Sequence, residues 1–179
     1  MIYYILALNV FLVDQGSKWL VVRNMKIGDE IPVIGNFFVI TSHRNTGAAF
    51  GILEGQRWLF IVITSVVLIG MIYYLRVLIR DKKSLLATAL GFLFGGAFGN
   101  FLDRLITGEV VDFLQFNFVF RFFGKPVDYT FAIFNIADAA ITVGVNLIIL
   151  DTIISTIKER KSNKHESEPG PEPEPTNEP

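Results

Sequence analysis

The chain has 179 residues, of which 51% are apolar and 18% charged, and its formal net charge is −1. It has no cysteine and two histidines, His43 and His165, which excludes disulfides, thiol nucleophiles and metal centres built from several histidines. The charge is unevenly distributed. Residues 166–179 hold five Glu and no basic residue, while residues 1–165 carry 16 basic and 12 acidic side chains. This small and scattered positive excess argues against a nucleic-acid partner.

Four segments are apolar over about the 20 residues that a membrane-spanning helix needs. They cover residues 1–22, 58–75, 85–105 and 131–157. The first lacks the basic start and the small-residue cleavage site of a signal peptide, so we interpret it as a retained helix. The sequence therefore predicts an all-α membrane protein, a four-transmembrane-helix bundle formed by residues 1–160.

Lysine and arginine residues indicate the orientation of this bundle. They are concentrated in residues 76–83 and 158–164, and such clusters mark the cytoplasmic side of a membrane. With four helices, both termini are then cytoplasmic. The connections 23–57 and 106–130 face outward.

The C-terminal segment 161–179 is acidic and holds five of the seven prolines. Such a composition cannot bury apolar surface, so we expect a disordered cytoplasmic tail.

Both outer connections contain strand-like segments. Residues 31–41 are β-branched and aromatic, with a turn expected at Gly35–Asn36, and residues 113–123 carry phenylalanine at alternate positions. The pattern predicts a small extracytoplasmic β/aromatic cap. Whether it only covers the bundle or also lies on the lipid surface and guides a substrate is left open by the pattern.

Several polar residues interrupt the apolar segments at one common depth. At about 1.5 Å per helical residue, they fall in the outer third of the membrane. Charges inside a spanning helix cost about 2.5–3.5 kcal/mol on insertion scales, so they generally mark function. The set, with Asp112 in the loop just after the third helix, comprises Asp14, Lys18, Asn100, Asp103, Asp112, Asn135 and Asp138.

Spacing within the helices suggests some contacts. Asp14 and Lys18 are four residues apart, which favours an ion pair on one helix face. Ala87, Gly91, Gly95 and Gly99 form a small-residue stripe that allows another helix to approach. Asp103 continues this stripe into the bundle. Arg104 can extend to the lipid headgroups.

These residues limit the chemistry. A catalytic Ser-His pair is unfavourable because His165 lies in the cytoplasmic tail and His43 in an outer loop. A Ser-Lys dyad of Ser17 and Lys18 is weak, since adjacent residues of a helix do not face each other. A carboxylate pair remains, with Asp112 and Asp138 as the best candidates. Two close carboxylates share a proton, so that one activates water and the other protonates the leaving group. A proton-coupled transporter stays the alternative.

Five short motifs resemble, in order and spacing, those of the bacterial lipoprotein signal peptidases, also called signal peptidase II. They are Asp14–Lys18 (DQGSK), Asn45–Phe50 (NTGAAF), Gly99–Arg104 (GNFLDR), Val111–Phe113 (VDF) and Phe134–Asp138 (FNIAD). The resemblance covers about residues 1–160.

The resemblance implies an intramembrane aspartic endopeptidase of the bacterial cytoplasmic membrane, active toward its outer face. Its substrates would be diacylglyceryl-modified prolipoproteins, cut just before the lipid-bearing cysteine. Their signal peptide is itself an apolar helix, which the small-residue stripe would also suit. It would need no cofactor or metal, contact membrane lipids, bind no nucleic acid and function as a monomer. A non-catalytic lipoprotein assembly factor is a further alternative.

Carried over by position, the resemblance implies that Asp112 and Asp138 are catalytic. It also implies that Asp103 is structural and pairs with Arg104. The residues expected to bind substrate or support the site are Asp14, Lys18, Asn45, Gly47, Asn100, Asp103, Arg104, Asn135 and Ala137.

Overall fold

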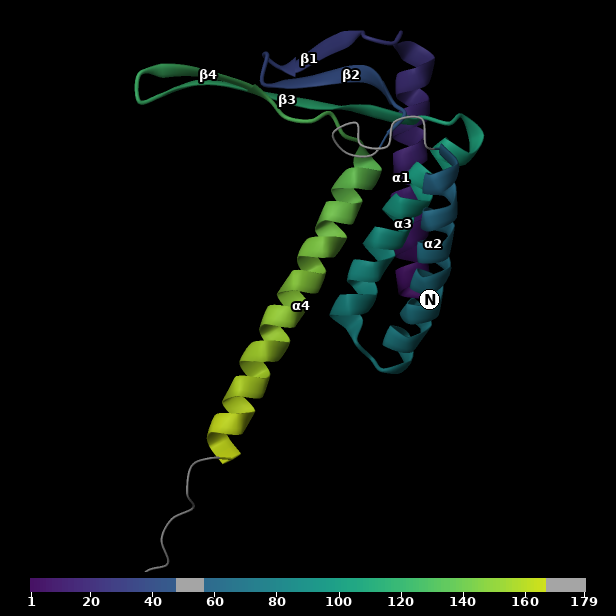
Figure 1. Cartoon of the computed structure of the whole chain (residues 1–179), viewed down its shortest axis with the longest axis vertical. Helices are drawn as coiled ribbons and strands as arrows, with labels where there is room; N and C mark the ends of the chain where they lie inside the picture. Colours follow the sequence, from purple (N-terminus) through teal and green to yellow (C-terminus); the bar gives the residue numbers. More distant parts are fainter. Residues whose placement is uncertain (48–56, 167–179) are drawn as a thin grey trace, which may run out of the picture.

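The computed structural model describes residues 1–47 and 57–166 and contains the four predicted spanning helices (Figure 1). All four are long and apolar enough to cross a membrane. Helices α1, α2 and α3 run side by side, whereas α4 leans away from them toward its C-terminal end (Figure 1). The helices are α1 (Ile2–Asn24), α2 (Arg57–Arg80), α3 (Ser84–Ile106) and α4 (Ile136–Glu166).

The bounds of α4 differ from the predicted 131–157 at both ends. The helix starts later because Phe134 is held by strand-type hydrogen bonds, accepting from the backbone N–H groups of Phe113 and Leu114. At its other end, α4 continues through residues 161–166, which we had expected to be disordered. The rest of the expected tail, residues 167–179, lies outside the described residues.

An antiparallel sheet lies across one end of the bundle, in the order β1-β2-β3-β4 (Figure 1). The strands are β1 (Glu30–Ile34), β2 (Phe38–Asn45), β3 (Val110–Phe122) and β4 (Lys125–Thr130). Gly35 adopts φ +49° in the predicted turn between β1 and β2. The small β/aromatic cap is therefore confirmed. The loop expected around Asp112 is wrong, because Asp112 lies within β3, paired in register with His43 of β2.

Helix α3 is the central helix of the bundle, and its small residues explain why. Gly91 and Gly95 face Tyr3 and Ala7 of α1, while Gly96 on another side of α3 faces Ala137 of α4. The expectation that the stripe lets a helix approach is confirmed. The idea that it could also receive a signal peptide is wrong, because α1 already fills it.

This packing gives a stability prediction for Gly95. A Cβ atom there would lie 2.6 Å from the backbone oxygen of Ala7, whereas one on Gly70 of α2 would meet nothing within 4 Å. We expect Gly95→Ala to lower the free energy of unfolding by about 1–3 kcal/mol. The control, Gly70→Ala, should leave it unchanged or raise it by up to about 1 kcal/mol. Denaturant titration in detergent checks this, and equal midpoints for the two variants would refute the close packing of α1.

Candidate active site

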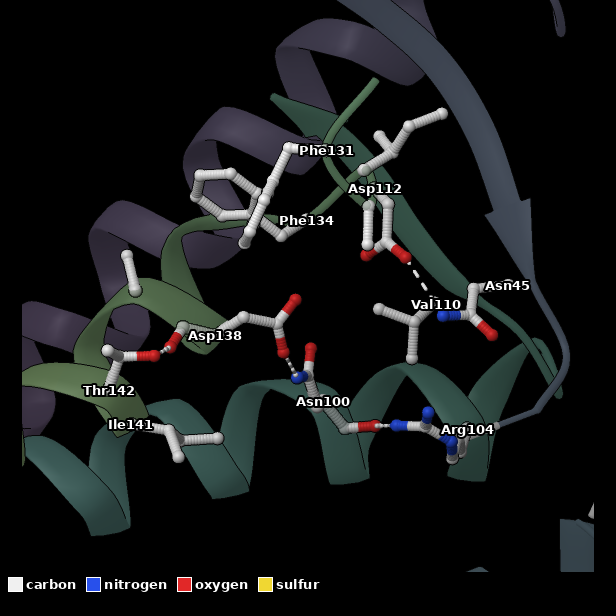
Figure 2. A pocket seen from close by; sticks show the side chains of 13 residues that line it. Asn45, Asn100, Arg104, Val110, Asp112, Phe131, Phe134, Asp138, Ile141 and Thr142 are labelled. Carbon is white, nitrogen blue, oxygen red and sulfur yellow. Dashed lines mark hydrogen bonds between the residues drawn. The ribbon is translucent and has the colours of Figure 1, made fainter. Parts of the chain in front are cut away.

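Two carboxylates from different elements face one cavity. Asp112 comes from the start of strand β3 and Asp138 from the first turn of α4 (Figure 2). The cavity has a volume of about 660 Å³ and lies between α3, α4 and the sheet. Most of its wall is apolar, so the two carboxylates and their four polar neighbours, Asn45, Asn100, Arg104 and Thr142, form the reactive part. The lining includes Asn45, Asn100, Arg104, Val110, Asp112, Phe131, Phe134, Asp138, Ile141 and Thr142.

Asp112 is buried, and an amide holds each of its oxygens. Its Oδ2 accepts a hydrogen bond from Asn45 Nδ2 at 2.9 Å, and its Oδ1 accepts one from Asn135 Nδ2 at 2.7 Å. Burial raises the pKa of the Asp112 carboxyl above 3.8, and the nearby charge of Asp138 raises it further, against the lowering effect of the two amides. Asp112 thus retains a proton to higher pH than an exposed aspartate would.

Asp138 is positioned by the start of its own helix. Asn135 and Asp138 bond reciprocally: Asn135 N donates to Asp138 Oδ2 at 3.1 Å, and Asp138 N donates to Asn135 Oδ1 at 3.0 Å. This is a capping box, with Asn135 as the N-cap and Asp138 three residues later. The second contact of the carboxylate is Asn100 Nδ2, which donates to Oδ1 at 2.8 Å (Figure 2).

Asn135 connects the two carboxylates. Its Nδ2 donates to Asp112 and, at 3.2 Å, to Asn100 Oδ1, while its backbone N–H donates to Asp138. The side chain is fully buried. One residue therefore fixes strand β3, helix α3 and the start of α4 relative to one another.

A second buried network supports the site from α1. Lys18 Nζ contacts Asp14 Oδ2 at 2.8 Å, Asp103 Oδ2 at 2.7 Å and Asn100 Oδ1 at 2.9 Å. The predicted ion pair between Asp14 and Lys18 is confirmed. Asp14 Oδ1 also accepts the backbone N–H of Ala137 at 2.9 Å, so α1 holds the first turn of α4. Ala137 is fully buried there.

Two expectations for α3 are wrong. Asp103 pairs with Lys18 and accepts a hydrogen bond from Gln15 Nε2 at 2.9 Å, instead of pairing with Arg104. Arg104 does not extend to the headgroups, since its guanidinium donates to the backbone oxygens of Gly47 and Asn100 at 2.8 and 3.2 Å. It also lies over the Phe60 ring, 5.0 Å from the centroid, and lines the cavity.

Two residues with supporting contacts were missed. Gln15 links Asp14 with Asp103, and only its place in the first motif could have suggested this. Arg57, the first residue of α2, donates to the backbone oxygens of Arg104 and Leu105, both at 2.7 Å. It thereby caps the C-terminal end of α3. A basic residue at the outer end of an apolar segment was its only signal.

All residues expected at the site are brought together around the two carboxylates. Residues 48–50, the end of the second motif, lie outside the described residues. Gly47 is buried, and its N–H donates to Asn45 Oδ1 at 3.0 Å. Fold and site define a class: a multi-pass membrane protein with four spanning helices and a pair of carboxylates, Asp112 buried and Asp138 partly exposed, that line one cavity where the bundle meets a small sheet.

Residues 6–154 match the family model described as "Signal peptidase (SPase) II". The chain belongs to this family of aspartic peptidases, and the predicted family membership and enzyme class are confirmed.

Relatives and a solved structure agree with this assignment. The chain is 50% identical to the lipoprotein signal peptidase of Halalkalibacterium halodurans, covering 93% of this chain and 99% of the relative. It is 47% identical to that of Bacillus subtilis, covering 90% and 99%. A bacterial membrane enzyme solved by the in meso method at 2.3 Å resolution is similar with a TM-score of 0.75 and 43% identity, over 94% of each chain.

Proposed function

We propose that this chain removes the signal peptide from prolipoproteins that already carry diacylglycerol, by cutting just before the lipid-bearing cysteine. The reaction class follows from the family. The observation that supports the assignment of residues is the cavity with two carboxylates, each held by amide donors on both oxygens. The transporter and assembly-factor alternatives are not favoured.

The two carboxylates divide the proton transfers between them. We assign the shared proton to Asp112, whose pKa is raised by burial, and the role of base to Asp138. Asp138 takes a proton from water as the water oxygen attacks the scissile carbonyl carbon, and Asp112 protonates the carbonyl oxygen. The C–N bond then breaks as Asp138 protonates the leaving nitrogen and a hydroxyl of the intermediate returns its proton to Asp112.

The remaining site residues position this pair. Asn45, Asn100 and Asn135 orient the carboxylates, and Lys18 with Asp14 and Asp103 holds α1 against α3 beneath them. Arg104, with Gly47 as its acceptor, supplies a positive charge in the cavity wall. Every group in this scheme comes from residues 1–160 of one chain, so a single copy forms the catalytic unit.

We place the enzyme in the bacterial cytoplasmic membrane with its active site toward the outer face and both termini in the cytoplasm. The N-terminus and the C-terminal end of α4 lie at the end of the bundle opposite the sheet (Figure 1). The basic residues 76–83 and 158–164 belong to that end. The exposed aromatic rings of Phe120, Phe122 and Phe123 on the β3–β4 hairpin suit the lipid surface above the site.

A mass-spectrometric assay tests the function. Purified protein in lipid is given a diacylated prolipoprotein and, separately, the same precursor without lipid. We expect cleavage of the diacylated precursor immediately before the modified cysteine, and far less of the other. Cleavage at a different bond, or binding of the precursor without any change in its mass, would overturn the proposal.

The shared proton also predicts the pH dependence. The raised pKa of Asp112 keeps its proton present to higher pH, so activity should fall as pH rises through that pKa and the pair loses its proton. Activity should fall at low pH as well, when both carboxylates are protonated, giving a bell-shaped profile. Single-turnover rates from about pH 4 to about pH 9 measure this. A flat profile in that range would contradict the shared proton.

A further inference from the structure

Asn9 places a polar amide on the lipid-facing side of α1. It lies about 12 Å along the helix from Met1, well inside a 23-residue span. Its side chain is exposed and borders a hollow whose other walls are apolar, including Val13, Ala140 and Val143. The amide is thus surrounded by hydrocarbon, where an unsatisfied polar group is costly.

No residue that the structure describes forms a hydrogen bond with the Asn9 side chain. Two other exposed amides on spanning helices are satisfied within their own helix. Asn24 Nδ2 donates to the Leu20 oxygen at 2.7 Å and Asn146 Nδ2 to the Thr142 oxygen at 2.9 Å. Within the described part of the chain, the amide donor and acceptor of Asn9 therefore have no hydrogen-bond partner.

Asn9 belongs to a continuous exposed row along α1. The row repeats every three and four residues, as the contact positions of a parallel helix pair do. All its members are exposed, and it consists of Ile2, Ile5, Asn9, Leu12, Gly16 and Trp19. The buried residues of the helix, such as Ala7, Asp14 and Lys18, lie on the opposite face toward α3. The row thus faces away from α3, and at Asn9 it borders the hollow beside α4.

We propose that two copies of this chain associate side by side through this row, which we call the Asn9 row, with the two Asn9 amides hydrogen-bonded to each other. All copies insert into a membrane in the same orientation, so Asn9 lies at the same depth in each. A two-fold axis along the membrane normal then brings identical residues together. An amide carries both donors and an acceptor, so it is complementary to its own copy.

The features of the row favour a second copy over other occupants. A lipid chain or an apolar signal-peptide helix offers Asn9 no side-chain partner. Gly16 lies one heptad after Asn9 and has open space around its Cα, so it lets two helix backbones come close. Because a single chain holds the whole candidate site, association is not required for cleavage, and Asn9→Leu should retain activity.

The absence of cysteine from the chain allows a direct test by disulfide formation in lipid vesicles. Gly16→Cys places a thiol in the row, close enough to its copy for the roughly 4 Å Cβ separation of a disulfide. Val66→Cys is the matched control, since Val66 of α2 is 67% exposed and lies at about the same distance from the cytoplasmic end. Upon oxidation at high lipid excess, we expect Gly16→Cys to form covalent dimers and Val66→Cys to form few.

The contribution of the amide is tested in the Gly16→Cys background. Adding Asn9→Leu should weaken association on the order of tenfold, the effect of losing an interhelical hydrogen bond. Adding Asn146→Leu removes another exposed amide, one whose Nδ2 already donates to its own helix, and should change nothing. Equal dimer yields from Gly16→Cys and Val66→Cys, or a yield unaffected by Asn9→Leu, would overturn the proposal.

Discussion

Replacing Asp112 or Asp138 by asparagine is expected to reduce kcat/KM on the order of a thousandfold, the scale of general acid–base catalysis. Each amide keeps the size of the carboxyl group but can neither take a proton from water nor deliver one to the substrate. The loss should appear in kcat, because the cavity wall that binds substrate is otherwise unchanged. Single-turnover cleavage of a diacylated precursor measures it.

Asp151→Asn is the matched control for these two variants. Asp151 is also an acidic residue on α4, but it lies more than three helical turns beyond Asp138, away from the cavity. It should keep full activity. Thermal unfolding should show that both site variants remain folded. Full activity in either Asp112→Asn or Asp138→Asn would remove that residue from the proposed pair.

The largest expected effect on stability is that of Lys18→Met. Lys18 is 3% exposed, and its ammonium contacts two carboxylates and one amide. Removing the ammonium leaves Asp14 and Asp103 buried without their counter-ion, which typically costs about 3–5 kcal/mol. We expect a strongly lowered unfolding midpoint and a loss of activity, since Asn100 loses a contact that orients it.

Two further variants separate the buried ion network from a general effect of removing a lysine. Lys82→Met changes an exposed lysine at the α2–α3 turn and should leave the midpoint unchanged. Asp103→Asn combined with Lys18→Met removes one uncompensated charge and should recover part of the stability. A Lys18→Met midpoint equal to that of the unaltered chain would show that the network contributes little.

Much of the architecture could be predicted because it follows from local patterns. Apolar length defined the four helices, and alternating phenylalanines with the Gly35 turn predicted the sheet. Asp14 and Lys18 were placed together by their spacing of four. The common depth of the polar residues predicted that they gather at one end of the bundle, which the hydrogen bonds from Lys18 through Asn100 to Asp138 show.

The contacts between elements could not be derived in the same way. Outside its own helix, Lys18 could pair with Asp103, Asp112 or Asp138. Which of these carboxylates it reaches depends on how α1 is rotated against α3. The pairing of Asp103 with Arg104, which the resemblance implied, is wrong because adjacent helical residues diverge by about 100° and Asp103 faces Lys18 of α1. The role of Arg57 likewise depends on tertiary packing, which brings it to the end of α3.

The length of α4 has a practical consequence at the end opposite the sheet. Its 31 residues extend about 46 Å, compared with a hydrocarbon layer about 30 Å thick. The last turns, with Lys158, Arg160 and Lys161, therefore stand in water as a stiff spacer about 15 Å long. A purification tag or fluorescent reporter joined beyond Glu166 would start clear of the bilayer and on the far side of the protein from the substrate, where it should not obstruct cleavage.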